Sequence, residues 1–364
     1  MTQERSFGFL NEGLPQIVKN VEKLNPSDLP QWARELAELQ YLPDQIIIAE
    51  PLSYCAGVVR ANRVADELLE KSKGQVYLYH APIHNETKLA QWEERGAIVV
   101  NSLDDIADGS VVLFSAHGVS PEIWSAAKAK RLRGADATCP LVYKTHKEVR
   151  ELVDQGYKIL LIGHRNHDEV VGTIGEAPET IIVIHPKIAK EDVDSILEGL
   201  KEEKLALRSQ TTLAVGDLEE LVEYIRSKRS DLNLPAKSDV CYATHNRQEA
   251  VIQTIVGSGA QLMLIFGSDE TKRSPSSNSI RLREVVQSLG VPAFLVEDVS
   301  EIKSEWFRGS SRIGVSAGAS AAPERVAEFL ACMSAIGLKN SQIARVTVAE
   351  EPQVFAPAKR FDFS

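Results

Sequence analysis

The sequence predicts an α/β fold in which three small units are arranged with pseudo-threefold symmetry around a central site. Three times a cysteine stands just ahead of a helical pattern, in IIIAEPLSYCAGVVRANRVADELLEK, ADATCPLVYKTHKEVRELVDQG and SDVCYATHNRQEAVIQTIVGSG. Each helical pattern is followed by short apolar runs, which are typical of buried parallel strands. Each repeat then closes on a strand that runs into small polar residues, as in VVLFSAHGVS, LALRSQTTLA and IGVSAGASAA.

The chain begins with acidic, leucine-rich text that precedes the first repeat. The segments LPQIVKNVEKL and LPQWARELAELQ have helical spacing and are separated by NPSD. Such a pattern predicts amphipathic helices that pack on the body of the protein or on a partner. We therefore expect residues 1–44 to form an N-terminal helical extension without chemistry of its own.

Three units are expected over residues 45–139, 140–238 and 239–335, with a C-terminal tail over 336–364. Cys139 follows Cys55 by 84 residues (139 − 55), and Cys241 follows Cys139 by 102 residues (241 − 139), each the length of one small α/β unit. The polar loops APIHNET, RNHDEVVGT and DETKRSPSSNS occupy equivalent places in the three units. Since ligands bind beyond the carboxyl ends of parallel strands, we expect these loops to face one central pocket.

Composition narrows the functional classes. The formal charge of −10 and the pI near 5.4 argue against a nucleic-acid partner, which requires a concentrated basic face. No apolar run approaches the roughly 20 residues of a membrane span, and the N-terminus lacks the pattern of a secretory signal. Four cysteines without a CxxC pair suit a reducing compartment. We expect a cytoplasmic protein that binds neither nucleic acid nor membrane.

The three repeated cysteines predict a metal centre. A thiol at a helix N-terminus lies near partial positive charge, which lowers its pKa and favours metal ligation. Zinc generally takes a fourth protein ligand or histidine-rich ligands, whereas a 4Fe-4S cluster on three cysteines keeps one iron open to substrate. Three sulfurs and a polar pocket therefore favour the cluster. Cys332 in FLACMSAIG has no such repeat and is expected to be a small buried hydrophobe.

Nine motifs between about residues 46 and 335 resemble, in order, those of the 4-hydroxy-3-methylbut-2-enyl diphosphate reductase family, also called LytB. They are CAGVVRA, HNETKLAQWEERGAI, FSAHGVS, DATCPLVYKTHKEV, HDEVVGTIGE, SQTTL, CYATHNRQEAV, SSNSIRL and GVSAGASA. The resemblance implies a three-lobed fold around a 4Fe-4S cluster and a place in isoprenoid biosynthesis by the methylerythritol phosphate pathway. It also implies reductive removal of an allylic hydroxyl to give isopentenyl and dimethylallyl diphosphate, with electrons from a donor such as ferredoxin or flavodoxin.

The resemblance also assigns site residues. It implies the cluster ligands Cys55, Cys139 and Cys241, which the repeat had already selected. It implies a catalytic acid at Glu169, supported by His167 and Thr211. The contacts to the allylic diphosphate substrate would be His84, His117, His167, Thr211, Ser276, Ser277, Asn278 and Ser320. Neutral donors of this kind can hold a diphosphate without a basic patch, which agrees with the acidic net charge.

Several departures from the family pattern leave alternatives open. His245 replaces a threonine close to Cys241, and an inserted DETKRSP segment precedes SSNS, where Lys272 and Arg273 face either the substrate or water. The insertion and the N-terminal extension suggest a paralogue that acts on another allylic substrate. A cluster-bearing redox sensor without turnover is a third hypothesis. Retention of Glu169, Thr211 and the serine and asparagine donors disfavours a sensor, which needs the cysteines but no diphosphate pocket.

Overall fold

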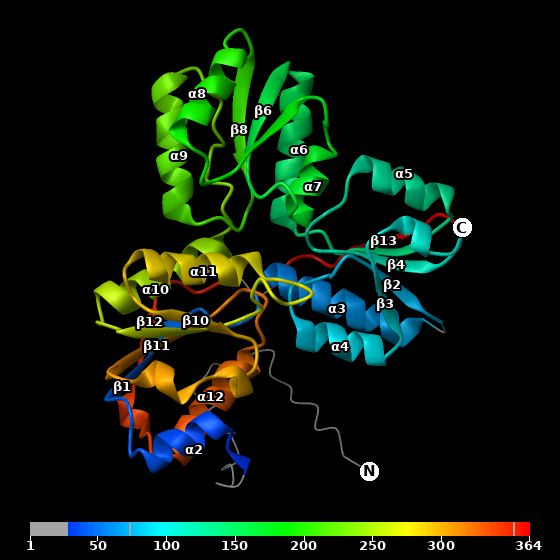
Figure 1. Cartoon of the computed structure of the whole chain (residues 1–364). Coiled ribbons are helices and arrows are strands. Elements are labelled where there is room, and N and C mark those ends of the chain that lie inside the picture. Colours follow the sequence, from blue (N-terminus) through cyan, green and yellow to red (C-terminus); the bar gives the residue numbers. More distant parts are fainter. Residues whose placement is uncertain (1–27, 73, 352–353) are drawn as a thin grey trace.

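The computed structural model describes residues 28–72, 74–351 and 354–364. Three α/β lobes surround a common centre, as Figure 1 shows. The predicted fold class is confirmed. In the described part of the chain, no helix is long and apolar enough to span a membrane.

The first lobe follows Cys55. Its strands are β2 (Val76–Tyr79), β3 (Ala97–Val100), β4 (Val111–Phe114), β5 (Arg133–Asp136) and β13 (Lys359–Asp362). Its helices are α3 (Ala56–Lys71), α4 (Glu86–Glu94) and α5 (Pro121–Ala129), with the short turn η2 (Leu103–Asp105). The sheet order is β13-β5-β4-β2-β3, and all neighbours are parallel except β13, which pairs antiparallel with β5.

The second lobe follows Cys139 and is the uppermost one in Figure 1. Its strands are β6 (Tyr157–Ile162), β7 (Ile181–Ile184) and β8 (Lys204–Ser209). Its helices are α6 (Pro140–Asp154), α7 (Asp168–Ile174), α8 (Lys190–Gly199) and α9 (Val215–Lys228). The three strands form a parallel sheet in the order β7-β6-β8.

The third lobe follows Cys241. Its strands are β1 (Gln45–Glu50), β9 (Leu262–Phe266), β10 (Ala293–Val296), β11 (Arg312–Ala317) and β12 (Ile343–Thr347), in the parallel order β10-β9-β11-β1-β12. Its helices are α2 (Gln31–Glu38), α10 (Tyr242–Val256), α11 (Ser277–Ser288) and α12 (Pro323–Ala335), with the turns η3 (Val299–Glu301), η4 (Ser304–Phe307) and η5 (Asn340–Gln342).

The apolar runs become strands because both faces of each sheet are covered. In β6, Leu160 and Ile162 pack into one hydrophobic cluster while Ile159 and Leu161 pack into another on the opposite face. In β1, Ile46 and Ile47 likewise pack into different clusters on opposite faces of the sheet, and so do Leu113 and Val112 in β4. Parallel strands that are buried on both faces read as continuous apolar runs, which explains why the sequence shows no alternation.

Strands are exchanged between the lobes. β1 precedes Cys55 in the chain but lies in the third lobe, between β11 and β12. The tail supplies β12 to the third lobe and β13 to the first. The residue boundaries expected for the three units stay a prediction. Each expected unit is one continuous segment, whereas two of the sheets combine strands that are distant in the chain.

The helical extension falls partly outside the described residues, which exclude 1–27. Its described part contains α2, whose Trp32 stacks on Phe307 and Phe329 with ring centroids 5.8 and 5.7 Å away. The indole also donates a hydrogen bond to the Val299 carbonyl at 2.7 Å. This helix therefore packs on the third lobe, far along the chain from its own position.

Candidate active site

The three repeated cysteines occupy equivalent positions. Cys55, Cys139 and Cys241 are the N-cap residues of α3, α6 and α10. The backbone N–H of each donates to a carbonyl of the preceding lobe in the cycle, at Ala319, Ala116 and Thr211 respectively, over 2.9 to 3.1 Å. Each acceptor lies two residues beyond the end of a strand, after β11, β4 and β8. The same bond made three times is the local basis of the pseudo-threefold arrangement.

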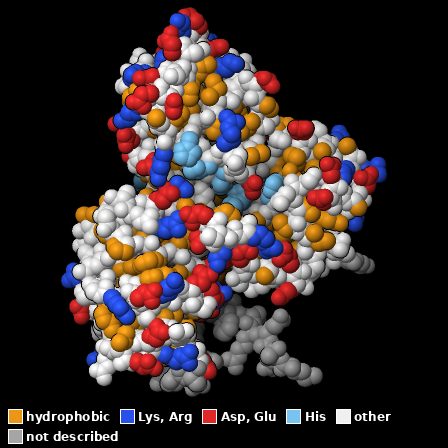
Figure 2. All heavy atoms as spheres, viewed as in Figure 1, with side chains coloured by type: hydrophobic (Ala, Val, Ile, Leu, Met, Phe, Trp, Pro, Cys, Tyr) orange, Lys and Arg blue, Asp and Glu red, His pale blue; other side chains and the backbone are white. Residues whose placement is uncertain are grey.

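One pocket lies where the lobes meet and spans about 770 Å³ of space outside protein atoms, part of which is open to solvent. Figure 2 shows histidine side chains in the hollow between the lobes. All twelve residues predicted for the site line this pocket. They are Cys55, His84, His117, Cys139, His167, Glu169, Thr211, Cys241, Ser276, Ser277, Asn278 and Ser320.

The three cysteines lie near one another and are half-buried. A Cβ atom placed on Gly57 would be 3.2 Å from the Cys139 sulfur and 3.8 Å from the Cys55 sulfur, so glycine there allows α3 to approach closely. Burial raises the pKa of Cys139 to about 12 and that of Cys241 to about 11, and it also raises the pKa of Cys55. Burial therefore outweighs the lowering expected from the helix N-termini.

The chemistry of these thiols bears on the group that they could hold. Within the described ranges, no three His, Cys, Asp or Glu side chains are close enough together to hold one metal ion. Buried thiols with raised pKa values ionise only beside a strong positive charge, which iron supplies. Three such thiols around a shared pocket fit a polynuclear iron centre with one cysteine from each lobe.

Three histidines form a second part of the pocket. The ring centroids of His84 and His117 lie 4.4 Å apart, and that of His167 lies 5.8 and 5.5 Å from them. Burial lowers the pKa of His84 to about 4 and that of His167 to about 3, and it holds the pKa of His117 well below its usual value. In the described structure, Nε2 of His84 and Nε2 of His167 are buried without a hydrogen-bond partner, and Nδ1 of His117 makes no hydrogen bond but lies 3.9 Å from the Asp168 carboxylate. Such ring nitrogens are suited to an anionic ligand.

Glu169 is held by two hydrogen bonds at the start of α7. Its Oε1 accepts from the Thr211 backbone N–H at 2.7 Å, and its Oε2 accepts from the Thr211 hydroxyl at 2.8 Å. The side chain is 4% exposed, and burial raises its pKa to about 7 although both bonds to Thr211 oppose the shift. A carboxyl with this pKa can deliver a proton near neutral pH.

The hydroxyl and amide groups of the third lobe form a linked set. Ser276 caps α11, and its hydroxyl lies 3.3 Å from that of Ser320. Asn278 accepts from the Ala319 N–H at 2.9 Å and donates to the Thr244 hydroxyl at 2.9 Å. The Thr244 hydroxyl lies in turn 3.2 Å from the Cys241 sulfur. The donor set is therefore joined to one of the thiols.

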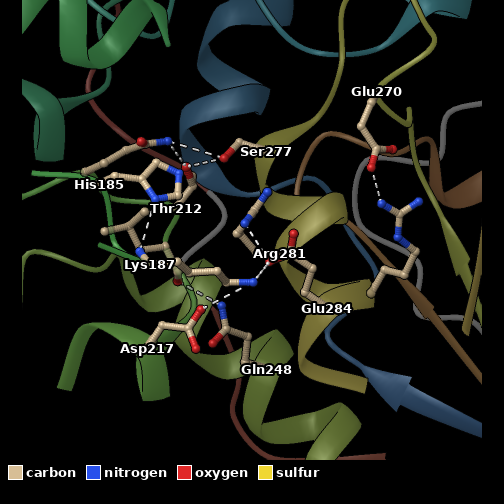
Figure 3. A network of polar contacts seen from close by, with 12 residues as sticks. His185, Lys187, Thr212, Asp217, Gln248, Glu270, Ser277, Arg281 and Glu284 are labelled. Carbon is tan, nitrogen blue, oxygen red and sulfur yellow. Dashed lines mark hydrogen bonds and ion pairs between the residues drawn. The ribbon is translucent and has the colours of Figure 1, made fainter. Parts of the chain in front are cut away.

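Polar contacts cross the seam between the second and third lobes (Figure 3). The Thr212 and Ser277 hydroxyls are 3.1 Å apart across it. Farther out, Lys187 of the second lobe pairs with Glu284 of the third at 3.2 Å. Polar contacts thus fix the position of Ser277, which lines the pocket, relative to the second lobe.

Comparison with known proteins assigns the family. The family model described as LytB protein matches residues 46–334. The chain belongs to the LytB family. A LytB relative from Rhodopirellula baltica, named 4-hydroxy-3-methylbut-2-enyl diphosphate reductase, is 42% identical over 286 residues, which cover 79% of this chain and 86% of the relative. A relative of the same name from Acidothermus cellulolyticus is 40% identical over 323 residues, covering 88% of this chain and 91% of its own.

Solved structures agree with this assignment. The E-1-hydroxy-2-methyl-but-2-enyl-4-diphosphate reductase from Plasmodium falciparum superposes with a TM-score of 0.77 at 30% identity, covering 86% of this chain and 96% of its own. A second structure, of (E)-4-hydroxy-3-methyl-but-2-enyl diphosphate reductase, gives a TM-score of 0.56 at 31% identity. The match covers 80% of this chain and 99% of that structure's chain. The LytB resemblance seen in the sequence motifs is confirmed, and with it the prediction of an enzyme.

Several pocket residues were not predicted from the sequence. Thr244, rather than the substituted His245, contacts the Cys241 sulfur, and His245 is exposed. The spacing of three residues from an N-cap is a signal that would have indicated Thr244. Phe355 of the tail also lines the pocket, and no sequence pattern links this segment to the site.

Proposed function

We propose that the protein removes the allylic hydroxyl of 4-hydroxy-3-methylbut-2-enyl diphosphate by reduction, giving isopentenyl and dimethylallyl diphosphate. The observation that carries the proposal is the convergence of three thiols, a carboxyl with raised pKa and unpartnered histidine nitrogens on one pocket in a LytB-family chain. Two electrons and two protons are consumed, the C–O bond is broken and water leaves. An external low-potential donor, such as ferredoxin or flavodoxin, supplies the electrons.

The proposed cofactor is a 4Fe-4S cluster held by Cys55, Cys139 and Cys241. When bound on three cysteines, such a cluster supplies electrons and one iron that is open to a substrate oxygen. The Thr244 hydroxyl and backbone N–H, 3.2 and 3.4 Å from the Cys241 sulfur, are placed to hydrogen-bond a thiolate. Hydrogen bonds to ligating sulfurs tune the potential of iron-sulfur centres.

The remaining residues bind the substrate and move a proton. His84, His117 and His167 present ring nitrogens to the diphosphate, and the serine and asparagine set of α11 supplies further neutral donors. Glu169 gives its proton to the leaving hydroxyl, and Thr211 holds the carboxyl in place through both oxygens. Each residue is assigned the binding or proton-transfer role that its functional group can perform at its place in the pocket.

A paralogue with another substrate remains the second candidate, and the structure gives it less support than the insertion suggested. None of residues 269–275 lines the pocket as described. The discriminating experiment compares kcat/KM for this diphosphate, a longer hydroxylated allylic diphosphate and the parent diol under anaerobic conditions. We expect the highest value with 4-hydroxy-3-methylbut-2-enyl diphosphate, and a higher value with another substrate would favour the paralogue.

The Glu169 pKa predicts the pH dependence of the reaction. Since the protonated carboxyl is the active form and its pKa is about 7, kcat/KM should fall as pH rises above that value. The bound diphosphate adds negative charge, so the corresponding decline in kcat should begin at higher pH. Steady-state rates measured from pH 6 to 9 give the decline of kcat/KM and the decline of kcat. A kcat/KM that stays flat across this range would contradict the role of Glu169 as the acid.

Lys272 of the inserted segment is expected to have no part in substrate binding. Its ammonium group pairs with Glu301, and Arg273 pairs with Glu93 at 2.8 Å, so neither cation points into the pocket. Lys272→Ala should therefore leave the KM for the diphosphate within about twofold, as expected for a partly exposed ion pair away from the ligand. A KM that rises steeply and becomes sensitive to salt would show that the lysine contacts the substrate.

A further inference from the structure

The inserted segment, residues 269–275, connects the third lobe to the first. Arg273 pairs with Glu93 at 2.8 Å and with Glu86 at 3.3 Å, and both carboxylates belong to α4. The backbone N–H of Ser274 donates to the same Glu86 at 2.6 Å. These contacts fix the position of Ser274 at the edge of the first lobe.

Ser274 contacts one of the pocket histidines from behind. Its hydroxyl oxygen lies 3.0 Å from Nδ1 of His84, and the serine is 4% exposed. The other ring nitrogen of His84, Nε2, is buried and without a partner among the described residues, and His84 lines the pocket. Among the described residues, the rings of His117 and His167 and the charge of Asp168 also lie near His84, and Glu297 and Arg325 line a small cavity beside it.

The chemistry of a serine hydroxyl makes this contact informative. A hydroxyl can donate to Nδ1 of a neutral imidazole or accept from Nδ1–H, and an anion at Nε2 selects the first arrangement, in which Nε2 carries the proton. If the imidazole gains a proton beside an anion, the same hydroxyl can rotate and accept from Nδ1–H. In both states Nε2 carries a proton and is a donor toward the pocket.

A second pocket histidine shows the same arrangement. Nδ1 of His167 accepts from the backbone N–H of Glu169 at 3.2 Å, which leaves the proton of the neutral ring on Nε2. Nε2 of His167 is also buried without a partner in the described structure. Two histidines from different lobes thus have Nδ1 held by the protein and Nε2 free for a ligand.

We propose that Ser274 is a positioning residue that keeps Nε2 of His84 a hydrogen-bond donor for the substrate's diphosphate. This inference rests on the proposed function, because it takes the ligand of the pocket to be a diphosphate. The inserted segment then contributes to the site through His84, without touching substrate. The ion pairs of Arg273 hold the serine in place for this purpose.

The test uses the anaerobically purified, cluster-loaded protein and inorganic pyrophosphate as the probe. Ser274→Ala should weaken pyrophosphate binding, measured by calorimetry, by about tenfold, the effect of one lost charge-assisted hydrogen bond. KM for the allylic diphosphate should rise by a similar factor while kcat changes less, since ground and transition states share the phosphates. Ser274→Thr should restore both values. Thr271→Ala is the matched control, because that hydroxyl bonds only to Asp269 of the same segment, at 2.6 Å, among the contacts described.

A double-mutant cycle separates positioning from a general structural role. In a His84→Gln background, Ser274→Ala should cause little further loss of pyrophosphate affinity, because the serine acts through the imidazole. An equal loss in both backgrounds, or unchanged affinity in the single variant, would overturn the inference even if the wild type reduces the allylic diphosphate. Conversely, the expected cycle together with no turnover of that substrate would sink the proposed reaction and leave the role of Ser274 intact.

Discussion

Glu169→Gln should retain the cluster and substrate binding but lose about 10²- to 10⁴-fold in kcat, the usual effect of removing a general acid. The amide keeps the shape of the side chain, and its carbonyl can still accept from the Thr211 backbone N–H. The Thr211 hydroxyl can rotate to accept from the new amide nitrogen. What the variant lacks is a proton to give to the leaving hydroxyl.

The measurement is the steady-state rate with the diphosphate and an excess of low-potential reductant, with iron content determined on the same samples. Glu179→Gln provides the control, because Glu179 lies in the same lobe on an exposed loop away from the pocket. The control should match the wild type. If Glu169→Gln instead turns over within a few-fold of the wild type, Glu169 is not the proton donor.

Replacing any one of Cys55, Cys139 or Cys241 by alanine should abolish both the 4Fe-4S cluster and turnover. Each cysteine comes from a different helix N-terminus, so no nearby thiol can take over its position. Cys332→Ala should retain cluster and activity, because Cys332 is a buried residue of α12 whose thiol packs in a hydrophobic cluster of the third lobe.

Iron and acid-labile sulfide, determined on protein purified without oxygen, measure this prediction. We expect about four of each per chain in the wild type and in Cys332→Ala. Stoichiometric zinc without sulfide in the wild type would contradict the cluster assignment, although the three cysteines would still meet at one pocket.

The sequence was sufficient to predict that the three cysteines meet, because they recur in phase. Cys55, Cys139 and Cys241 stand at equivalent places in three repeats, and helix N-capping by each of them explains why the pattern survives in the structure. The strand runs could also be predicted, since burial on both faces of a parallel sheet gives continuous apolar text. Local patterns were therefore enough to identify both the strands and the residues at their ends.

What the sequence could not give depends on pairing over long distances. Nothing local in β1 shows that it joins β11 and β12 in the third lobe, and nothing in the tail shows that Phe355 reaches the pocket. The direction in which the pKa values of the three thiols shift was also predicted wrongly. The helix N-terminus is visible in the sequence, whereas the extent of burial that raises the pKa of Cys139 is not.

Reduction of an allylic diphosphate in this pocket, by a cluster held by the three lobes, can be tested directly. Anaerobic protein with its cluster quantified should be incubated with 4-hydroxy-3-methylbut-2-enyl diphosphate and a low-potential reductant, and the products separated. We expect isopentenyl and dimethylallyl diphosphate, with two electrons consumed for each molecule formed. Neither product from protein that carries a full, reducible cluster would contradict this expectation.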